Sequence, residues 1–231
     1  MRARLTYGRG PRLIAAFFLV VLSLATVLFV VRPGAGNTSQ ANTRAVGGEF
    51  GGIPQNGSLL GDPNAPATLV EFADLQCPFC AQFARHVLPG LLEEWVRPGR
   101  LRLDLRLVSA IGPDSRRAER WATAAALQDR LWQFSELFFL NQGTENSGYV
   151  TRLFLLAVAA ATPGLDGGKA LAARGSERVA AQLARARRSA KRLGVSSIPS
   201  FFLLRPGRSP VRLHPSELTT AAVSSAIEDA L

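Results

Sequence analysis

The only two cysteines among the 231 residues, Cys77 and Cys80, stand three positions apart. One pair cannot build a framework of several disulfides, but it can close and reopen one small ring as electrons pass. The apolar run 67–72 before the pair predicts a buried strand, and residues 78–96 predict a helix. Cys77 is therefore expected where a strand meets a helix, with Pro78 at the first helical position, where a missing N–H is tolerated.

This position predicts different reactivity for the two thiols. The unpaired amide groups of a helix N-terminus carry about half a positive charge. The thiolate is the reactive form of cysteine, and the pKa of free cysteine is about 8.5. Because Cys77 lies at the helix start, its pKa is expected to be lowered, and it is the predicted attacking thiol. Cys80, one turn inside the helix, is predicted to resolve the mixed disulfide.

Two other interpretations of the cysteine pair stay open. Such a pair can supply half of a zinc site, but zinc takes four ligands, and the two histidines, His86 and His214, are not at ligand spacing. The cysteines can also be inert structural residues. Redox chemistry is the favoured interpretation, so we expect no metal and no cofactor besides the Cys77–Cys80 disulfide.

A second motif lies near the C-terminus, where residues 194–204 read Gly-Val-Ser-Ser-Ile-Pro-Ser-Phe-Phe-Leu-Leu. Together with the strand of residues 71–74 and the cysteine motif, it resembles the thioredoxin superfamily. The order and spacing of the motifs, and the lead-in at residues 61–67, are similar to the DsbA-type branch, which includes membrane-tethered thiol–disulfide oxidoreductases of bacteria. The resemblance covers about residues 58–231.

The resemblance implies roles for four residues near the cysteines. Pro199 would follow a cis peptide bond and face the disulfide; without the resemblance it reads as an ordinary trans proline at a strand start. Ile198, with Pro199, would offer a backbone edge to the substrate, and Pro78 and Phe79 would complete the substrate-binding surface. The strongest oxidants of the family have histidine in place of Phe79, so a less extreme oxidant is expected.

Glu71 is the one acidic residue inside the predicted buried strand. Burying a carboxylate is costly unless the group is neutral or paired. The resemblance implies a proton relay at this position, with Glu71 accepting the proton of Cys80. The alternative is a carboxylate at the edge of the strand that faces water.

The N-terminal region predicts a membrane anchor. Residues 13–31 carry no charge, and a helix of that length spans about 28 Å, close to the hydrocarbon thickness of a membrane. Arginines are denser before this run than after it, which predicts a cytoplasmic segment 1–12, a single-pass signal anchor and an extracytoplasmic catalytic domain. A cleaved signal peptide is the alternative, although its apolar region is usually about 7–15 residues. Residues 32–57 are polar and glycine-rich and predict a flexible linker.

The net charge of +10 is a poor guide to partners. Five arginines flank the apolar run, so the rest of the chain carries +5, with the basic residues spread out. Nucleic acid is therefore not an expected partner. The densest basic stretch, residues 185–192, predicts a solvated helix face, with contact to anionic lipid headgroups as a minor alternative.

Residues 58–231 are predicted to form one α/β domain. A strand–helix–strand unit is followed by a helical block at about 113–194 and then by strand–strand–helix. This is the order of a thioredoxin-like fold with a DsbA-type helical insertion, preceded here by one transmembrane helix.

The expected function is that of an exported protein disulfide oxidoreductase, which forms or exchanges disulfides in extracytoplasmic proteins. The resemblance implies exported thiols and disulfides as substrates, a membrane quinone-linked redox partner, and a monomer. One alternative is a membrane-tethered disulfide reductase, for example in cytochrome maturation. The other is a non-catalytic binding module or chaperone that keeps the fold.

Overall fold

The computed structural model describes residues 34–231, so the predicted cytoplasmic segment 1–12 and anchor 13–31 lie outside the described residues. Among the helices that are described, none has the length and apolar character needed to cross a membrane. The chain divides into a unit of residues 1–40 and a compact unit of residues 41–231, and the second unit contains both motifs.

One mixed sheet lies at the centre of the second unit, with the strand order β1-β2-β4-β3-β5-β6. The central strands β3 and β4 run parallel, and every other neighbouring pair is antiparallel. The strands are β1 Gln55–Asn56, β2 Leu59–Leu60, β3 Thr68–Ala73, β4 Arg102–Leu107, β5 Ser200–Leu204 and β6 Val211–Leu213. A parallel pair needs a crossover connection, which the helices between β3 and β4 provide.

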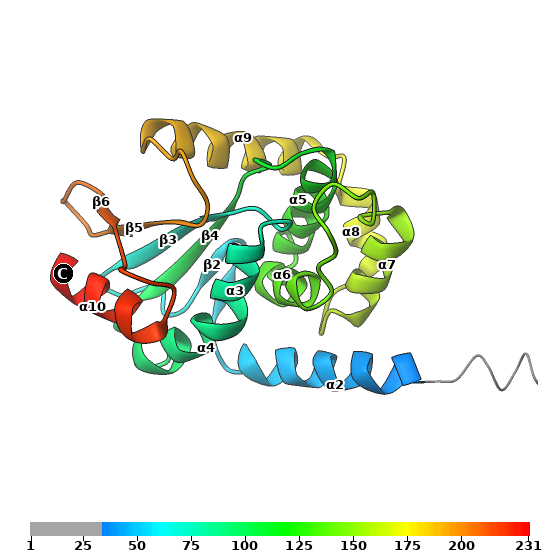
Figure 1. Ribbon diagram of the computed structural model, residues 1–231, viewed down its shortest axis with the longest axis horizontal. Helices are drawn as coiled ribbons and strands as arrows, with labels where there is room; N and C mark the ends of the chain where they lie inside the picture. The colour runs from blue at the N-terminus through cyan, green and yellow to red at the C-terminus, as the bar shows by residue number, and fades with distance from the viewer. Residues whose placement is uncertain (1–33) are drawn as a thin grey trace, which may run out of the picture. The chain divides into compact units, whose positions relative to one another are not determined.

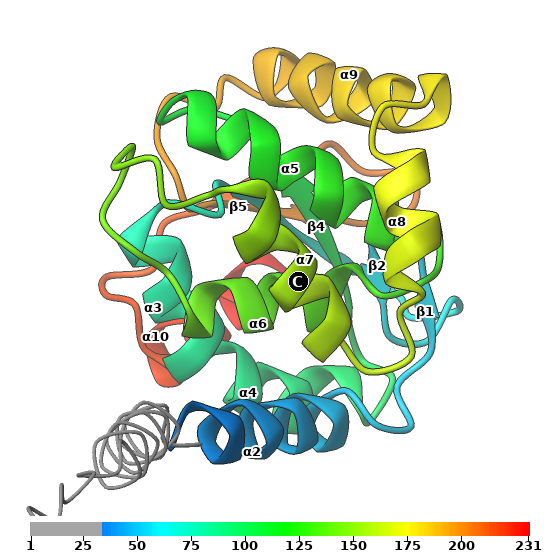
Figure 2. The same cartoon turned by 90° about the vertical axis from the view of Figure 1, so that its right-hand side faces the viewer.

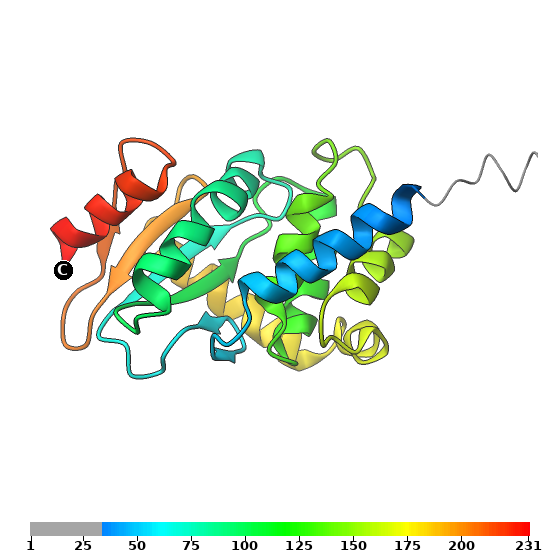
Figure 3. The same ribbon diagram turned by 90° about the horizontal axis from the view of Figure 1, so that it is seen from below.

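Helices cover both faces of this sheet. Figure 1 shows α9 on one face and α3, α4 and α10 on the other, and Figure 3 shows the second group lying across the sheet from below. The helices are α2 Gly34–Glu49, α3 Pro78–His86, α4 Leu88–Leu91, the π-helix η1 Leu92–Val96, α5 Pro113–Ala126, α6 Leu131–Leu140, α7 Arg152–Ala161, α8 Gly167–Ala173, α9 Glu177–Arg192 and α10 Thr220–Ala230. The order agrees with the one that the resemblance implies.

The central strand β3 is buried along its whole length, as predicted. Val70 and Phe72 belong to a small apolar cluster that includes Ala190 of α9, whereas Leu69 and Ala73 belong to the main core together with Cys80. Side chains alternate between the faces of a strand, so Glu71 shares the face of Leu69 and Ala73. The carboxyl group therefore lies on the face that carries the cysteine helix.

The helical insertion is held by aromatic side chains of α6. Figure 2 shows α5, α6, α7 and α8 grouped beside the sheet. Trp132, Phe134 and Phe138 are almost fully buried, and the Phe138 ring meets the Phe154 ring edge-on at 5.3 Å between centroids. Burying each such ring stabilises the fold by roughly 1.5–3 kcal/mol. These aromatic residues form part of the core.

The predicted flexible linker at residues 32–57 is wrong over most of its length. Helix α2 and strand β1 occupy that segment. Val46 and Phe50 are buried, and the Phe50 ring lies 6.4 Å from the Trp132 ring. The polar composition did not predict this ordered structure. Two apolar side chains are enough to hold a short segment against a core.

Replacing Phe50 with alanine is expected to destabilise the domain by roughly 3–5 kcal/mol, because it leaves a cavity against Trp132. The exposed Arg44, in the same segment, is the control, and Arg44→Ala is expected to change stability by no more than about 0.5 kcal/mol. Urea unfolding of the full chain measures both. Equal effects of the two substitutions would restore the linker interpretation.

Candidate active site

Cys77 caps the N-terminus of α3, as the sequence predicts. Its backbone is extended, with φ −71° and ψ 121°, and Pro78 begins the helix. The Cys77 N–H donates to the Asp74 carbonyl at 3.0 Å, and the Ala81 N–H donates to the Cys77 carbonyl at 3.0 Å. These two bonds fix the turn that carries the sulfur from the end of β3 to the helix start.

The two cysteines lie 3.3 Å apart as free thiols. Cys80 is 0% exposed, whereas Cys77, although only 4% exposed, lies in the wall of a cavity two positions before Phe79, which is 61% exposed. A thiolate that enters from outside therefore meets Cys77 first. This arrangement agrees with the predicted division into an attacking and a resolving cysteine.

The environment lowers the pKa of Cys77 to about 7. The largest cause is hydrogen bonding from the Cys80 thiol, and the backbone N–H groups of Cys80 and Phe79 act in the same direction. Burial and the negative charge of Asp74 oppose the shift. The amides are those of the first helical turn, so the helix N-terminus contributes as predicted, although the neighbouring thiol contributes more.

The pKa of Cys80 is raised well above its usual value. Burial is the main cause, followed by the hydrogen bond to Cys77 and the negative charge of Glu71. At neutral pH, Cys80 therefore keeps its proton while Cys77 is partly ionised. The hydrogen bond between the two thiols contributes to both shifts, because the Cys80 proton stabilises the Cys77 thiolate.

The second motif lies beside the cysteines. The Ile198–Pro199 peptide bond is cis, as the resemblance implies, and Pro199 directly precedes β5. The Cys77 Sγ lies 3.8 Å from the Ile198 carbonyl oxygen. The fold thus brings together two motifs that are 121 positions apart in the chain.

An apolar cavity of about 550 Å³ opens beside Cys77. Its lining includes all three predicted substrate-binding residues, Pro78, Phe79 and Ile198. A smaller cavity of about 280 Å³ is lined by Phe79, Pro199 and residues of β5 and β6. Phe79 lines both cavities, so its exposed aromatic ring lies between them, next to Cys77.

The thioredoxin family model matches residues 55–205, which is more than half of the chain. The chain belongs to the thioredoxin family. Over 101 residues it is 33% identical to a probable disulfide bond formation protein D of Bacillus cereus, an alignment that covers 43% of this chain and 47% of that protein. Over 98 residues it is 31% identical to disulfide bond formation protein D of Bacillus subtilis, an alignment that covers 40% of this chain and 43% of that protein. The chain thus aligns with about half the length of these curated relatives.

Solved structures share the fold of this chain. Oxidised BdbD from Bacillus subtilis superposes with a TM-score of 0.64 at 21% identity, covering 77% of this chain and 96% of that one. Chlamydia trachomatis DsbA superposes with a TM-score of 0.62 at 19% identity, covering 75% of this chain and 90% of that one. At these identities the likeness establishes the fold alone, a thioredoxin-like α/β fold with a helical insertion.

In this thioredoxin-family chain, the buried Asp74 supports the cysteine turn. Its Oδ2 accepts the N–H groups of Ala110 and Ile111 at 2.8 and 3.0 Å, and its Oδ1 accepts that of Gln76 at 2.9 Å. Asp74 therefore ties the start of the cysteine turn to the loop between β4 and α5, which lines the apolar cavity. The sequence analysis did not predict this role, because an aspartate in a turn is usually exposed.

Two glutamines complete the support, and neither was predicted. The Gln76 Nε2 donates to the Ser115 Oγ at 2.8 Å, and its Oε1 accepts the Asn146 N–H at 2.8 Å. The Gln142 Nε2 donates to the carbonyl oxygens of Leu75 and Cys77 at 2.8 and 3.2 Å. The helical insertion thus holds the cysteine turn through side-chain amides, which no local sequence signal reveals.

Glu71 is 6% exposed and lies in the middle of the sheet, opposite Leu105 of β4 and Phe201 of β5. The alternative of a strand-edge carboxylate facing water is therefore wrong. The pKa of Glu71 is raised to about 8, first by burial and then by the negative charges of Cys77 and Glu136. Its assignment as the proton relay stays a prediction.

Two further carboxyl groups, of the buried Glu136 and the half-buried Glu49, lie behind Glu71 and were not predicted. The pKa of Glu136 on α6 is raised to about 8 by burial and by Glu49, against the opposing effect of Arg85. The pKa of Glu49 is raised to about 7 by burial. Among residues 34–231, the Glu136 Oε2 and Glu49 Oε1 have no hydrogen-bond partner. A protonated carboxyl is the form that such a setting favours.

The cysteine pKa values predict a specific alkylation profile. In the reduced protein, Cys77 alkylation is expected to rise with a midpoint near pH 7. In Cys80→Ala the midpoint is expected to move upward, because the thiol donor that lowers the pKa of Cys77 is lost. Iodoacetamide kinetics with mass spectrometry measure both. In Cys77→Ala, Cys80 is expected to stay unreactive at neutral pH. A Cys77 midpoint unchanged by Cys80→Ala would contradict the assigned cause.

Glu136 predicts a pH dependence of stability. Because its folded-state pKa is raised from 4.5 to about 8, the unfolded chain loses the proton first, and stability falls as pH rises through this range. Glu136→Gln is expected to flatten the fall between pH 5 and 8, and the exposed-site control Glu228→Gln is expected to leave it unchanged. Urea midpoints at several pH values provide the measurement. An identical slope in Glu136→Gln and the unsubstituted protein would rule out the raised pKa.

Proposed function

We propose that the protein is an exported thiol–disulfide oxidoreductase, which forms or exchanges disulfides in extracytoplasmic proteins. The observation that carries this proposal is the pairing of Cys77, with its lowered pKa, and the buried Cys80, with its raised pKa, at the start of one helix. Inert structural cysteines need no such difference. The names of the Bacillus relatives, disulfide bond formation proteins, support the same chemistry.

The proposed reaction begins with the Cys77–Cys80 disulfide. A substrate thiolate attacks the Cys77 Sγ, the bond between the two cysteines breaks, and Cys80 leaves as a thiolate that takes up a proton. A second substrate thiolate attacks the substrate sulfur of the mixed disulfide, and Cys77 leaves as a thiolate. The substrate loses two electrons and gains a disulfide, while the enzyme gains two electrons and becomes a dithiol.

Glu71 is the proposed proton partner of Cys80. Its pKa of about 8 leaves the carboxyl mostly protonated at neutral pH, and Cys80 is the buried thiol whose pKa it raises. When Cys80 leaves as a thiolate, a neutral Glu71 can supply the proton without placing a second charge in the core. In the reverse direction, Glu71 accepts the proton as Cys80 attacks.

The substrate is proposed to lie across Phe79, with its backbone along Ile198 and its reacting sulfur at Cys77. The cavities on the two sides of Phe79 suit apolar side chains that flank the substrate cysteine. Pro78 and Pro199 complete the surface as residues without an N–H group. Such a surface accepts many sequences, because shape and apolar character select the substrate more than charge does.

The proposed setting is the outer face of a cell membrane, where the chain acts as an anchored monomer. The uncharged run at residues 13–31 and its arginine-rich flank support the anchor. A redox-active pair in an oxidising compartment needs an electron acceptor after each turnover, and a membrane quinone-linked partner is the proposed one.

One observation favours a second candidate, a membrane-tethered disulfide reductase. The pKa of Cys77, about 7, equals the value of about 7 typical of thioredoxin and is far above the value of about 3.5 in the oxidant DsbA. The reduction potential separates the candidates. A potential near −120 mV indicates an oxidant and one near −270 mV a reductase, on the approximate scale of these proteins. We expect a value between these limits.

Single cysteine substitutions test the attack-and-resolve mechanism. Cys77→Ser is expected to lower turnover by about a thousandfold or more, because the attacked sulfur is lost. Cys80→Ser is expected to trap mixed disulfides through Cys77, visible as high-mass species on non-reducing gels and removed by reductant. The matched control is the double variant, which is expected to form no such species. Absence of adducts from well-expressed Cys80→Ser would favour a non-catalytic binding module or chaperone.

A further inference from the structure

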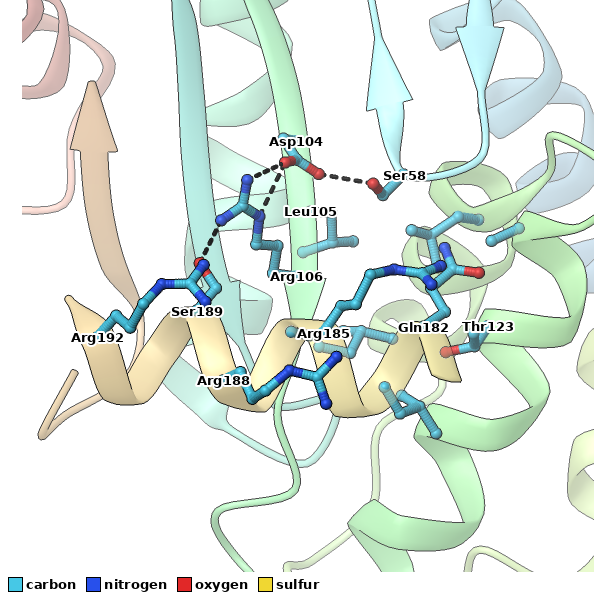
Figure 4. Close-up of a pocket in the computed structure, with 15 residues that line it drawn as sticks. Ser58, Asp104, Leu105, Arg106, Thr123, Gln182, Arg185, Arg188, Ser189 and Arg192 are labelled. Carbon is cyan, nitrogen blue, oxygen red and sulfur yellow. Dashed lines mark hydrogen bonds and ion pairs between the residues drawn. The ribbon is translucent and has the colours of Figure 1, made fainter. Parts of the chain in front are cut away.

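A second large cavity, of about 460 Å³, lies between α9 and β4. It shares no lining residue with the cavity beside Cys77, so it is separate from the redox centre. Figure 4 shows the face of α9 that borders it, with the strand residues behind. The cavity is not explained by the proposed redox function.

Arginine dominates the lining of this cavity. Arg185, Arg188 and Arg192 project from α9, and Arg106 comes from β4 (Figure 4). The spacings of three and four residues place the three α9 arginines on one face of the helix. Asp104 is the only acidic residue in the lining, which leaves an excess of three positive charges.

Arg106 is the fixed member of this group. It forms an ion pair with the Asp104 carboxylate at 2.7 Å and donates to the Ser189 Oγ of α9 at 2.5 Å. The Ser58 hydroxyl donates to the other oxygen of Asp104 at 2.6 Å. These bonds join β4, α9 and the β1–β2 turn into one polar wall. The charge of Arg106 is thereby balanced within the protein.

The three arginines of α9 have no such partner. Within residues 34–231, Arg185, Arg188 and Arg192 make no hydrogen bond or ion pair through their side chains, and all three are exposed. By contrast, Arg187 on the same helix forms an ion pair with the buried Glu119. Like charges three or four residues apart destabilise a helix. An anion in the cavity would relieve this repulsion.

The chemistry of the lining selects the kind of anion. A guanidinium group matches the oxygens of a phosphate with two parallel hydrogen bonds. A phosphate group carries up to about two negative charges, so it offsets the excess charge better than one carboxylate does. The cavity has no aromatic side chain on which a nucleic-acid base could stack. The lining therefore suits the phosphate group itself.

We propose that this cavity binds a phosphate-bearing anion through Arg185, Arg188 and Arg192, against the wall formed by Arg106 and Asp104. The ligand is either a soluble phosphate compound or the headgroup of an anionic phospholipid. The proposal does not depend on the redox function, because the cavity shares no lining residue with the one beside Cys77.

The test is calorimetric titration of the full chain with inorganic pyrophosphate at low ionic strength. The pocket variant, Arg185→Gln with Arg188→Gln and Arg192→Gln, is expected to bind about tenfold or more weakly. The control variant, Arg152→Gln with Lys191→Gln and Arg208→Gln, removes the same number of positive charges from exposed sites outside the cavity. Its affinity for pyrophosphate is expected to stay within about twofold of that of the unsubstituted protein, because salt screens the charges of exposed sites outside the cavity.

A second arm identifies the source of the phosphate. Binding of the same three proteins to phosphatidylcholine vesicles is measured with and without phosphatidylglycerol. If phosphatidylglycerol increases vesicle binding by the unsubstituted protein and the control variant, but not by the pocket variant, the site is assigned to a lipid headgroup. Pyrophosphate binding without such a gain assigns it to a soluble phosphate.

Either result supports the proposal, and two results overturn it. One is equal weakening in the pocket and control variants, which would mean that total charge alone attracts the anion. The other is that the unsubstituted protein neither binds pyrophosphate nor gains from the anionic lipid. Urea unfolding of each variant verifies folding, and an unfolded triple variant would be replaced by the three single substitutions.

Discussion

The redox site depends on one buried carboxylate, that of Asp74. It is 1% exposed and accepts three backbone N–H groups, one in the cysteine turn and two in the loop after β4. The Gln76 amide lies in a buried place, where a missing hydrogen bond costs about 1–3 kcal/mol, and the Ala110 and Ile111 amides are part-buried. By satisfying them together, Asp74 sets the position of Cys77 relative to the cavity wall that receives the substrate. The pKa values and the docking surface both follow from that position.

The same buried setting raises the pKa of Glu71 and leaves that of Cys77 lowered. Burial disfavours the charged form of both groups, so the difference lies in their hydrogen bonds. Cys77 receives a thiol proton and two helix amides, whereas Glu71 faces the negative charges of Cys77 and Glu136. Glu71 and Glu136 therefore stay mostly protonated at neutral pH beside the Cys77 thiolate. Moving a proton between Cys80 and Glu71 leaves the total charge of that pair unchanged.

Local patterns predicted the parts of the fold that rest on local rules. The apolar run of β3, the strand β5 at residues 200–204 and the helix start after Cys77 are examples, since periodicity and helix capping act over a few residues. The Asp74, Gln76 and Glu136 side chains were missed, because their burial is created by loops and helices that are distant in sequence. Helix α2 was missed for a related reason. The segment that ends with Phe50 has a polar average, and only its contact with the insertion makes it part of the domain.

Residues of helix α9 line two separate cavities. Arg187 and Ala190 line the redox cavity, while the flanking residues Arg185, Arg188 and Arg192 line the arginine cavity. On the redox side the charge of Arg187 is taken up by Glu119, which leaves the neighbourhood of Cys77 apolar. On the other side the charges stay unbalanced. An anion drawn to this helix is thus directed away from the cysteines, where a second negative charge would oppose thiolate formation at Cys77.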